Sequence, residues 1–315
     1  MTYRHLIDPE LASMVEDGPT LELSDATLPE VRAMRGSLYA GGASPALRSE
    51  VFVPAGDGSP DVRLIVHRPP GTATDRPAIF YIHGGGMVLD DATMREDIDG
   101  AMALRHGAVV VAIDYRLAPE TPFPGPIEDC LAGLVWLSAN AASLGVDPAR
   151  IALMGSSAGG GLAASLAQLA RDTGGPRACA QFLIYPMLDH RTGSRQDPHP
   201  NRVTGEFGWT RELNRYGWEA LRGDYAADDG RAGHFSASLG SLSSDLPPAF
   251  IATGSLDLFF EEILDYSRRL CRAGVPVELH SYPGAVHAFD MVASARVSRQ
   301  FQRDLDEALS RALGS

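Results

Sequence analysis

The sequence predicts an α/β fold with a mostly parallel β-sheet and helices on both of its faces. Strand-like runs such as "AVVVAIDY" at 108–115 are apolar throughout, which is typical of strands buried on both faces. Segments with helical periodicity separate these runs, and such alternation favours parallel strands joined by helical crossovers. A chain of 315 residues is ample for a large core of this kind.

The predicted elements begin with a helical N-terminal region at 1–40. An antiparallel pair of strands follows at 51–56 and 61–69, joined by a turn at 57–60. Further strands are predicted at 77–86, 108–115, 150–155, 180–186, 249–254 and 277–283. Helices are predicted at 127–145, 158–172, about 256–273 and 295–312.

One stretch, 187–246, interrupts the alternation of strands and helices. It is rich in Asp, Gly, Pro and aromatic residues, and a structureless loop of this length is implausible in a compact domain. We therefore expect it to supply helices over the carboxyl edge of the sheet. The chain is predicted to be a single domain over 1–315, with a cap formed by about 1–45 and 187–235.

Charge and cysteine content narrow the partners and the compartment. The net charge of −13 repels phosphate backbones and argues against nucleic acid. Cys130, Cys179 and Cys271 are scattered without a CxxC pair, which argues against a zinc site or a disulfide framework. No signal peptide is visible, and no run approaches the roughly 18 apolar residues of a membrane span. We expect a cytoplasmic protein that binds neither nucleic acid nor a membrane.

The stretch "GSSAGG" at 155–160 fits the pattern G-x-S-x-G between a predicted strand and a predicted helix. Only Ser157 has glycines at both required positions, because Met154 and Ala158 flank Ser156 at that spacing. A serine on this sharp turn exposes its hydroxyl, and the helix N-terminus offers the Ala158 N–H to an anion. The motif alone is also compatible with a serine that only caps the following helix. A phosphate loop is disfavoured, because no lysine follows and G-x-G-x-x-G is not matched.

A serine nucleophile needs a base and an orienting acid. His287 lies in "YPGAVHAFD", just after a predicted strand, whereas His280 lies inside that strand. Asp257 directly follows the strand at 249–254, although Glu261 or Glu262 would also suit a first helical turn. The order Ser157, Asp257, His287 is the one that this architecture favours.

Donors for an oxyanion are expected where the strand at 77–86 ends in His83-Gly84-Gly85-Gly86. Glycines leave backbone N–H groups unshielded, and each such donor contributes about 3–4 kcal/mol to a transition state. A triple glycine is also compatible with a flexible loop. Its combination with a downstream G-x-S-x-G is far more specific.

Together these motifs resemble those of the hormone-sensitive-lipase-like esterases, the bacterial family IV carboxylesterases of the α/β-hydrolase fold. The resemblance covers nearly the whole chain and is carried by "HGGG" (83–86), "DYRLAPETPFP" (114–124), "GSSAGG" (155–160), "GSLDLFFEE" (254–262) and "YPGAVHAF" (282–289). It implies an eight-stranded, mostly parallel sheet with a two-part helical cap.

The resemblance also implies roles for single residues. Ser157 is implied as the nucleophile, His287 as the general base and acid, and Asp257 as its orienting carboxylate. The implied oxyanion donors are Gly85, Gly86 and Ala158, with the choice between the three glycines left open, and His83 and Gly84 support the loop. Arg116 and Glu120 resemble a structural ion-pair segment. The mechanism requires no metal and no organic cofactor.

Three positions depart from the family pattern. Ser156 stands where relatives usually carry an acid, so its effect on His287 is open. Met87 replaces a residue that is usually aromatic or another large apolar type, and Ala288 replaces a glycine. The aromatic residues of the insertion suggest an apolar substrate pocket, and its predicted lining residues are Met87, Phe207, Trp209 and Trp218.

The sequence therefore predicts a serine carboxylesterase that hydrolyses small to medium, uncharged acyl esters through an acyl-enzyme. One alternative is a non-catalytic module that binds a small molecule on the same scaffold, as in plant hormone receptors that resemble this family and lack part of the triad. A related amidase or lyase is a further alternative. The resemblance also makes a homodimer an option.

Overall fold

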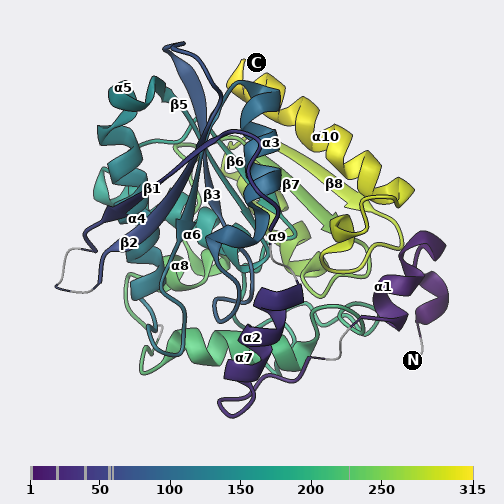
Figure 1. Cartoon of the computed structure of the whole chain (residues 1–315). Helices are drawn as coiled ribbons and strands as arrows, with labels where there is room; N and C mark the ends of the chain where they lie inside the picture. The colour runs from purple at the N-terminus through teal and green to yellow at the C-terminus, as the bar shows by residue number, and fades with distance from the viewer. Residues whose placement is uncertain are drawn as a thin grey trace.

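The structure is a computed structural model that describes residues 3–18, 21–38, 41–55, 58, 60–226 and 228–314. Its centre is an eight-stranded sheet in the order β1-β2-β4-β3-β5-β6-β7-β8 (Figure 1). The strands are β1 (Leu47–Val53), β2 (Val62–Arg68), β3 (Arg76–Ile82), β4 (Val109–Asp114), β5 (Val146–Ser156), β6 (Ala180–Ile184), β7 (Ala249–Gly254) and β8 (Val277–Tyr282). Only the pairings β1–β2 and β2–β4 are antiparallel within this sheet. The predicted eight-stranded, mostly parallel sheet is confirmed.

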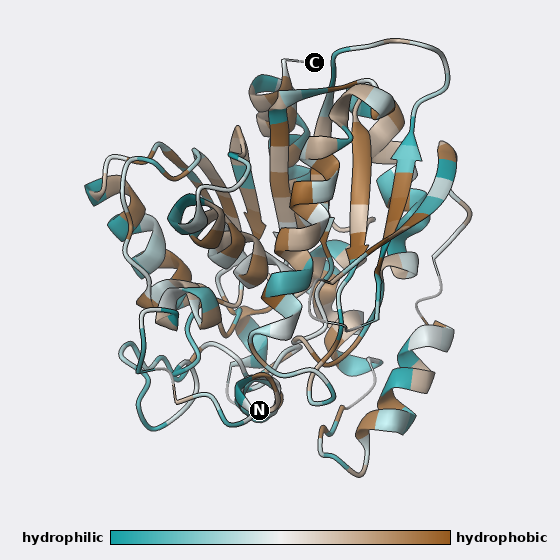
Figure 2. Ribbon diagram, turned by 90° about the vertical axis from the view of Figure 1, so that its left-hand side faces the viewer, coloured by the Kyte–Doolittle hydropathy of each residue, from teal (hydrophilic) through white to brown (hydrophobic). Residues whose placement is uncertain are grey.

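Helices cover both faces of the sheet (Figure 1). One face carries α3 (Glu96–His106) and α10 (Arg296–Leu313), and the other carries α4 (Gly125–Ala139), α6 (Ala158–Thr173) and α9 (Phe260–Arg272). Along β3, Phe80 belongs to one apolar cluster, whereas its neighbours Ile79 and Tyr81 belong to the other. This burial on both sides explains the continuously apolar strands, which Figure 2 shows as hydrophobic inner ribbons.

Several element bounds differ from the prediction. The first strand begins four residues earlier, at Leu47, and residues 56, 57 and 59 of the predicted strand and turn lie outside the described residues. The predicted helix 127–145 is interrupted at Asn140, after which α5 (Ala141–Leu144) ends at a left-handed glycine. Helix α9 begins only at Phe260, because residues 255–259 form a turn. Helix α3 was not predicted, because its exposed Ile98 and Leu104 blur the apolar face.

The N-terminal region is less continuous than predicted. It contains η1 (Arg4–Leu6), η2 (Pro9–Leu11), α1 (Ala12–Glu16) and α2 (Leu28–Leu38). The insertion contains α7 (Arg211–Arg222), α8 (Ala232–Phe235) and η4 (Ala237–Leu239), and two short turns, η3 (Ala92–Arg95) and η5 (Phe289–Met291), complete the elements. Among the described helices, none is both long and apolar enough to cross a membrane.

Helices α2 and α7 lie at the carboxyl end of the strands (Figure 1). Arg32 of α2 donates hydrogen bonds to the carbonyl oxygens of Val88 and Ala118 at 2.8 and 2.9 Å. A Cβ atom on Gly217 of α7 would lie only 2.7 Å from the carbonyl oxygen of Gly86. Both helices therefore pack on the chain that leaves β3.

Candidate active site

The turn between β5 and α6 presents Ser157 with φ +56° and ψ −121°, a conformation that non-glycine residues rarely adopt. Its neighbours are glycines because other backbone approaches them closely. A Cβ atom on Gly155 would lie 2.2 Å from the carbonyl oxygen of Gly159, and one on Gly159 would lie 2.1 Å from that of Ile82. The G-x-S-x-G spacing is therefore a steric requirement of this turn.

Ser157 and His287, which are 130 residues apart, meet at the carboxyl end of the sheet. The Nε2 atom of His287 lies 2.9 Å from the Oγ atom of Ser157, and its Nδ1 atom lies 2.8 Å from Oδ2 of Asp257. The side chain of Asp257 is fully buried, and Ser157 and His287 are only 7% and 6% exposed. The three predicted residues are thus brought into one hydrogen-bonded line.

Asp257 is held by a second contact that fixes its orientation. Its Oδ1 atom accepts a hydrogen bond from the backbone N–H of Phe259 at 2.9 Å, which leaves Oδ2 for His287. An ionised carboxylate only accepts hydrogen bonds, so Nδ1 of His287 carries the proton in this pair. The Nε2 atom is then free to accept the hydroxyl proton of Ser157, which is the arrangement that a general base requires.

The other two carboxylates considered for the acid have different partners. Oε1 of Glu261 accepts a hydrogen bond from the side-chain amide of Asn201 at 2.8 Å. Oε1 of Glu262 accepts one from the backbone N–H of Leu188 at 2.6 Å, and its Oε2 contacts the hydroxyl of Thr192. Both residues tie α9 to the insertion, and the structure brings Asp257 to the histidine.

The buried carboxyl of Glu262 leads to a prediction about stability. Burial raises the pKa of Glu262 well above its ordinary value. The folded protein then holds this proton more tightly than the unfolded chain, so the free energy of unfolding falls as the pH rises above about 4.3. Glu262→Gln offers an acceptor and a donor to the same partners without a charge. We expect its melting temperature to exceed that of the wild type by at least about 2 °C at pH 8.

The difference in melting temperature between Glu262→Gln and the wild type should increase as the pH rises. Thermal unfolding between pH 5 and 9 measures this difference. Glu261→Gln on the same helix is the matched control, and its gap to the wild type is expected to stay constant over this range. A Glu262→Gln gap that narrows as the pH rises would contradict the prediction.

The glycine loop after β3 lies against the serine turn. A Cβ atom on Gly84 would lie 3.3 Å from Cβ of Ser157, and Gly85 and Gly86 have φ values of +92° and +62°. Within the described residues, no acceptor is paired with the backbone N–H of Gly85, Gly86 or Ala158. These are the three N–H groups that the sequence predicts as oxyanion donors, and Gly84, directly before the two glycines among them, lies next to the serine.

His83 has a supporting position in this loop. Its Nδ1 atom lies 3.0 Å from the carbonyl oxygen of Gly84, and its ring stacks on that of Tyr115 with centroids 4.2 Å apart. The hydroxyl of Tyr115 in turn donates to the carbonyl oxygens of His83 and Gly84 at 3.2 and 3.1 Å. This pair of stacked rings holds the start of the glycine loop.

Ser156, next to the predicted nucleophile, has different partners. Its Oγ atom lies 2.8 Å from the hydroxyl of Tyr81, to which Nη1 of Arg95 donates at the same distance. The guanidinium of Arg95 lies 3.8 Å above the centre of the Tyr81 ring and is paired with the fully buried Asp99 at 2.8 Å. Sequence reasoning missed Tyr81 and Arg95, because nothing in their local pattern links them to the serine turn.

Two other departures from the family pattern also have a structural setting. Ala288 has φ +59°, in the left-handed region that favours glycine, so the family's usual glycine suits this position better. Met87 has φ +66°, and its side chain is 1% exposed within the main apolar cluster. Its carbonyl oxygen accepts a hydrogen bond from the N–H of Ala118 at 3.0 Å.

The predicted pocket residues separate into different environments. Trp209 lies against Gly86, and its ring centroid is 6.4 Å from that of His287. Phe207 is buried in the apolar cluster that also contains Ile7 of the N-terminal region. The ring of Trp218 instead packs against Phe235 and His190, at centroid distances of 5.4 and 6.2 Å. The structure brings Trp209, but not Trp218, to the triad.

Arg116 and Glu120, which resemble a structural ion-pair segment, each have an oppositely charged partner. Arg116 makes a forked pair with Asp129, with N–O distances of 2.6 to 3.0 Å. Glu120 receives two hydrogen bonds from Arg32 of α2 at 2.7 and 2.9 Å, and these lower its pKa. Both charges are therefore paired, and Glu120 joins the core to the N-terminal region.

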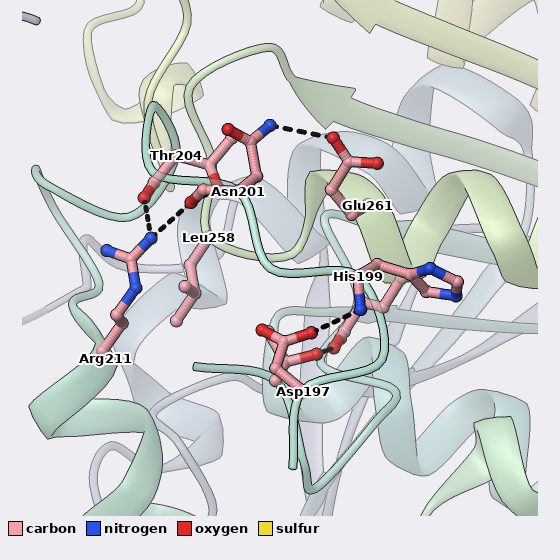
Figure 3. Close-up of a pocket in the computed structure, with 9 residues that line it drawn as sticks. Asp197, His199, Asn201, Thr204, Arg211, Leu258 and Glu261 are labelled. Atoms are coloured by element: carbon pink, nitrogen blue, oxygen red, sulfur yellow. Dashed lines mark hydrogen bonds between the residues drawn. The ribbon is translucent and has the colours of Figure 1, made fainter. Parts of the chain in front are cut away.

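A polar cavity of about 10 Å³ lies under the insertion, beside α9. Arg211 points toward Asn201 and Thr204, and Asn201 reaches Glu261 (Figure 3). This volume holds about one water molecule, so the cavity fits a structural water rather than an ester.

Comparison with known proteins agrees with this geometry. A family profile described as alpha/beta hydrolase fold matches residues 79–291. The carboxylesterase NlhH of Mycobacterium tuberculosis is 35% identical over 297 residues, which cover 90% of this chain and 88% of that protein. The ethyl acetate hydrolase of Pseudomonas putida is 35% identical over 238 residues, which cover 74% of this chain and 72% of that one. The structure of a bacterial heroin esterase matches with a TM-score of 0.90 and 35% identity over 100% of both chains.

The chain belongs to the alpha/beta hydrolase fold family. The resemblance to hormone-sensitive-lipase-like esterases is confirmed, and with it the prediction of a carboxylic ester hydrolase.

Proposed function

We propose that this protein hydrolyses small to medium, uncharged carboxylic esters through an acyl-enzyme on Ser157. One observation carries this proposal: the line of hydrogen bonds from Asp257 through His287 to Ser157, at 2.8 and 2.9 Å. The histidine thereby has a fixed orientation, and its Nε2 atom faces the hydroxyl of Ser157. The short acyl group named in the ethyl acetate hydrolase supports a small substrate.

In the first half of the reaction, Oγ of Ser157 attacks the ester carbonyl carbon while Nε2 of His287 takes the hydroxyl proton. The carbonyl oxygen becomes an oxyanion, and the N–H groups of Gly85, Gly86 and Ala158 donate to it. The intermediate then collapses: the bond from carbon to the alcohol oxygen breaks, and His287 gives its proton to the departing alcohol.

In the second half, water attacks the carbonyl carbon of the acyl-Ser157 ester. His287 takes a proton from this water, and the same donors hold the second oxyanion. Collapse breaks the bond from carbon to Oγ, the proton returns to Ser157, and the carboxylic acid leaves. Asp257 stabilises the imidazolium formed in each half and keeps Nδ1 protonated. No step calls for a metal or an organic cofactor.

The surroundings of the site are part of the same proposal. We propose that about 1–45 and 187–235 form a cap over the triad, supported by the packing of α2 and α7 on the chain after β3. We further propose a cytoplasmic location, supported by the scattered cysteines, which suit a reducing compartment. A homodimer stays a prediction from the family resemblance.

Covalent labelling tests the acyl-enzyme directly. A fluorophosphonate should modify the protein once per chain, on Ser157, and ester hydrolysis should fall in proportion to the label. Peptide mass spectrometry distinguishes Ser157 from the adjacent Ser156. A non-catalytic binding module would bind without covalent modification, and label on another residue would remove Ser157 as the nucleophile. Parallel assays with an ester and its matching amide separate an esterase from an amidase.

A further inference from the structure

Trp209 lies next to both the glycine loop that carries the proposed oxyanion donors and the proposed general base, His287. A Cβ atom on Gly86 would lie 2.4 Å from Cη2 and 2.5 Å from Cζ2 of the indole, so the outer edge of the ring lies on this glycine. The centre of the ring is 6.4 Å from that of His287. A Cβ atom on the preceding Gly208 would lie 3.2 Å from the carbonyl oxygen of His287. The indole therefore fills space next to a proposed oxyanion donor.

Buried polar contacts hold the indole in this place. The ring N–H of Trp209 donates to Oδ1 of Asn214 at 3.3 Å, and Nδ2 of Asn214 donates to the carbonyl oxygen of Thr192 at 2.8 Å. Asn214 is fully buried, so a ring that swung away would leave its amide oxygen unpaired, which is costly. Thr210 caps the helix that begins directly after Trp209. The indole is thus held in one position beside Gly86.

The reaction geometry decides which part of an ester meets the indole. The carbonyl oxygen faces the N–H groups of Gly85 and Gly86, and the leaving oxygen must face Nε2 of His287 to receive its proton. The acyl group then extends from the carbonyl carbon away from His287. The outer edge of the indole, Cη2 and Cζ2, lies on Gly86 at the oxyanion end, whereas the ring centre is 6.4 Å from that of His287. The acyl group is therefore the part that meets the ring.

We propose that Trp209 is a specificity-determining residue that limits the acyl group to short chains and leaves the alcohol less restricted. This inference rests on the proposed function, and it narrows the substrate class to esters of short carboxylic acids such as acetate. An octanoyl chain would have to displace the indole from Gly86 or break its hydrogen bond to Asn214.

The test compares kcat/KM for p-nitrophenyl acetate, butyrate and octanoate in the wild type, Trp209→Ala and Trp209→Phe. In Trp209→Ala, the ratio of octanoate to acetate should rise at least about tenfold, because a pocket discriminates by roughly that factor or more for each methylene. Trp209→Phe, which keeps an aromatic ring, should give a smaller rise. An unchanged ratio in both variants would overturn the role of Trp209.

Two controls separate this role from other effects. With acetate esters of ethanol, butanol and octanol, the variants should keep the wild-type order, and a change confined to this alcohol series would overturn the assignment to the acyl side. Trp218→Leu removes another indole from the same segment, where it packs on Phe235 and His190. It should leave the octanoate-to-acetate ratio unchanged, and an equal rise there would attribute the effect to a loosened fold.

The results that would disprove the proposed function differ from those that would disprove the role of Trp209. If the wild type hydrolysed none of these esters, or did so equally well after Ser157→Ala, the acyl-enzyme would be disproved. If it hydrolysed acetate through Ser157 while the Trp209 variants kept the wild-type ratio, only the limit set by the indole would be lost.

Discussion

Ser157→Ala is expected to lower kcat for p-nitrophenyl butyrate by about 10⁴- to 10⁶-fold, the loss typical of removing a nucleophile whose base and oxyanion donors remain. The reason is the 2.9 Å contact between Oγ of Ser157 and Nε2 of His287. Without Oγ, no acyl-enzyme forms, and His287 retains only a general-base role toward water. Steady-state kinetics on protein of matched melting temperature measures the loss.

The adjacent serine is the matched control for this prediction. Ser156→Ala removes an equivalent hydroxyl one residue away, but that hydroxyl contacts Tyr81, whereas the hydroxyl of Ser157 contacts His287. We expect it to keep kcat within about tenfold of the wild type, since its hydrogen bond acts on the turn and not on the substrate. A greater loss of kcat in Ser156→Ala would assign the nucleophile to Ser156. Comparable losses in both variants would show that any change in this turn abolishes activity.

Asp257→Asn is expected to lower kcat by about 10⁴-fold through the wrong tautomer of the histidine. The structure indicates which way the new amide turns. The N–H of Phe259 requires an acceptor at 2.9 Å, so the amide oxygen stays there and the amide nitrogen faces Nδ1 of His287. Nδ1 must then accept, which places the imidazole proton on Nε2. A protonated Nε2 cannot take the proton of Ser157.

The measurement separates this effect from a general loss of structure. A tautomer effect lowers kcat while KM and the melting temperature stay close to the wild-type values. Glu261→Gln, one turn along on α9, makes the same acid-to-amide change at a carboxylate that contacts Asn201 and not His287. We expect it to retain near-wild-type kcat. The reverse outcome, an active Asp257→Asn with an inactive Glu261→Gln, would assign the acid to Glu261.

Much of the fold follows from local pattern, and the exceptions have physical reasons. The buried parallel strands are recognisable because both faces are covered, which makes them apolar at every position. Strand β1 is less clear, because it lies at the edge of the sheet and exposes Leu47 and Phe52. Helix α3 is hard to predict for a related reason, because it buries the polar Glu96 and Asp99 while it exposes Ile98. Its hydrophobic side is therefore not continuous.

The candidate active site also has a part that can be predicted from the sequence and a part that cannot. Ser157, Asp257 and His287 are predictable because each follows a strand within a short motif, and parallel strands bring their carboxyl ends together. The surroundings depend on contacts between distant segments. Trp209 and Trp218 look equivalent in the sequence, yet one lies before α7 against Gly86 and the other lies on the helix against Phe235. Only the packing of the helix distinguishes them.

The hydrogen bonds from Ser156 through Tyr81 to Arg95 have a consequence for how mutations in this enzyme should be sampled. They run from the turn that carries Ser157 into the apolar cluster on the side of the sheet covered by α3. Positions that tune turnover are therefore expected on that side too, at Arg95 and its partner Asp99. A library restricted to the substrate pocket would omit them, so the interior beneath the strand ends belongs in the search.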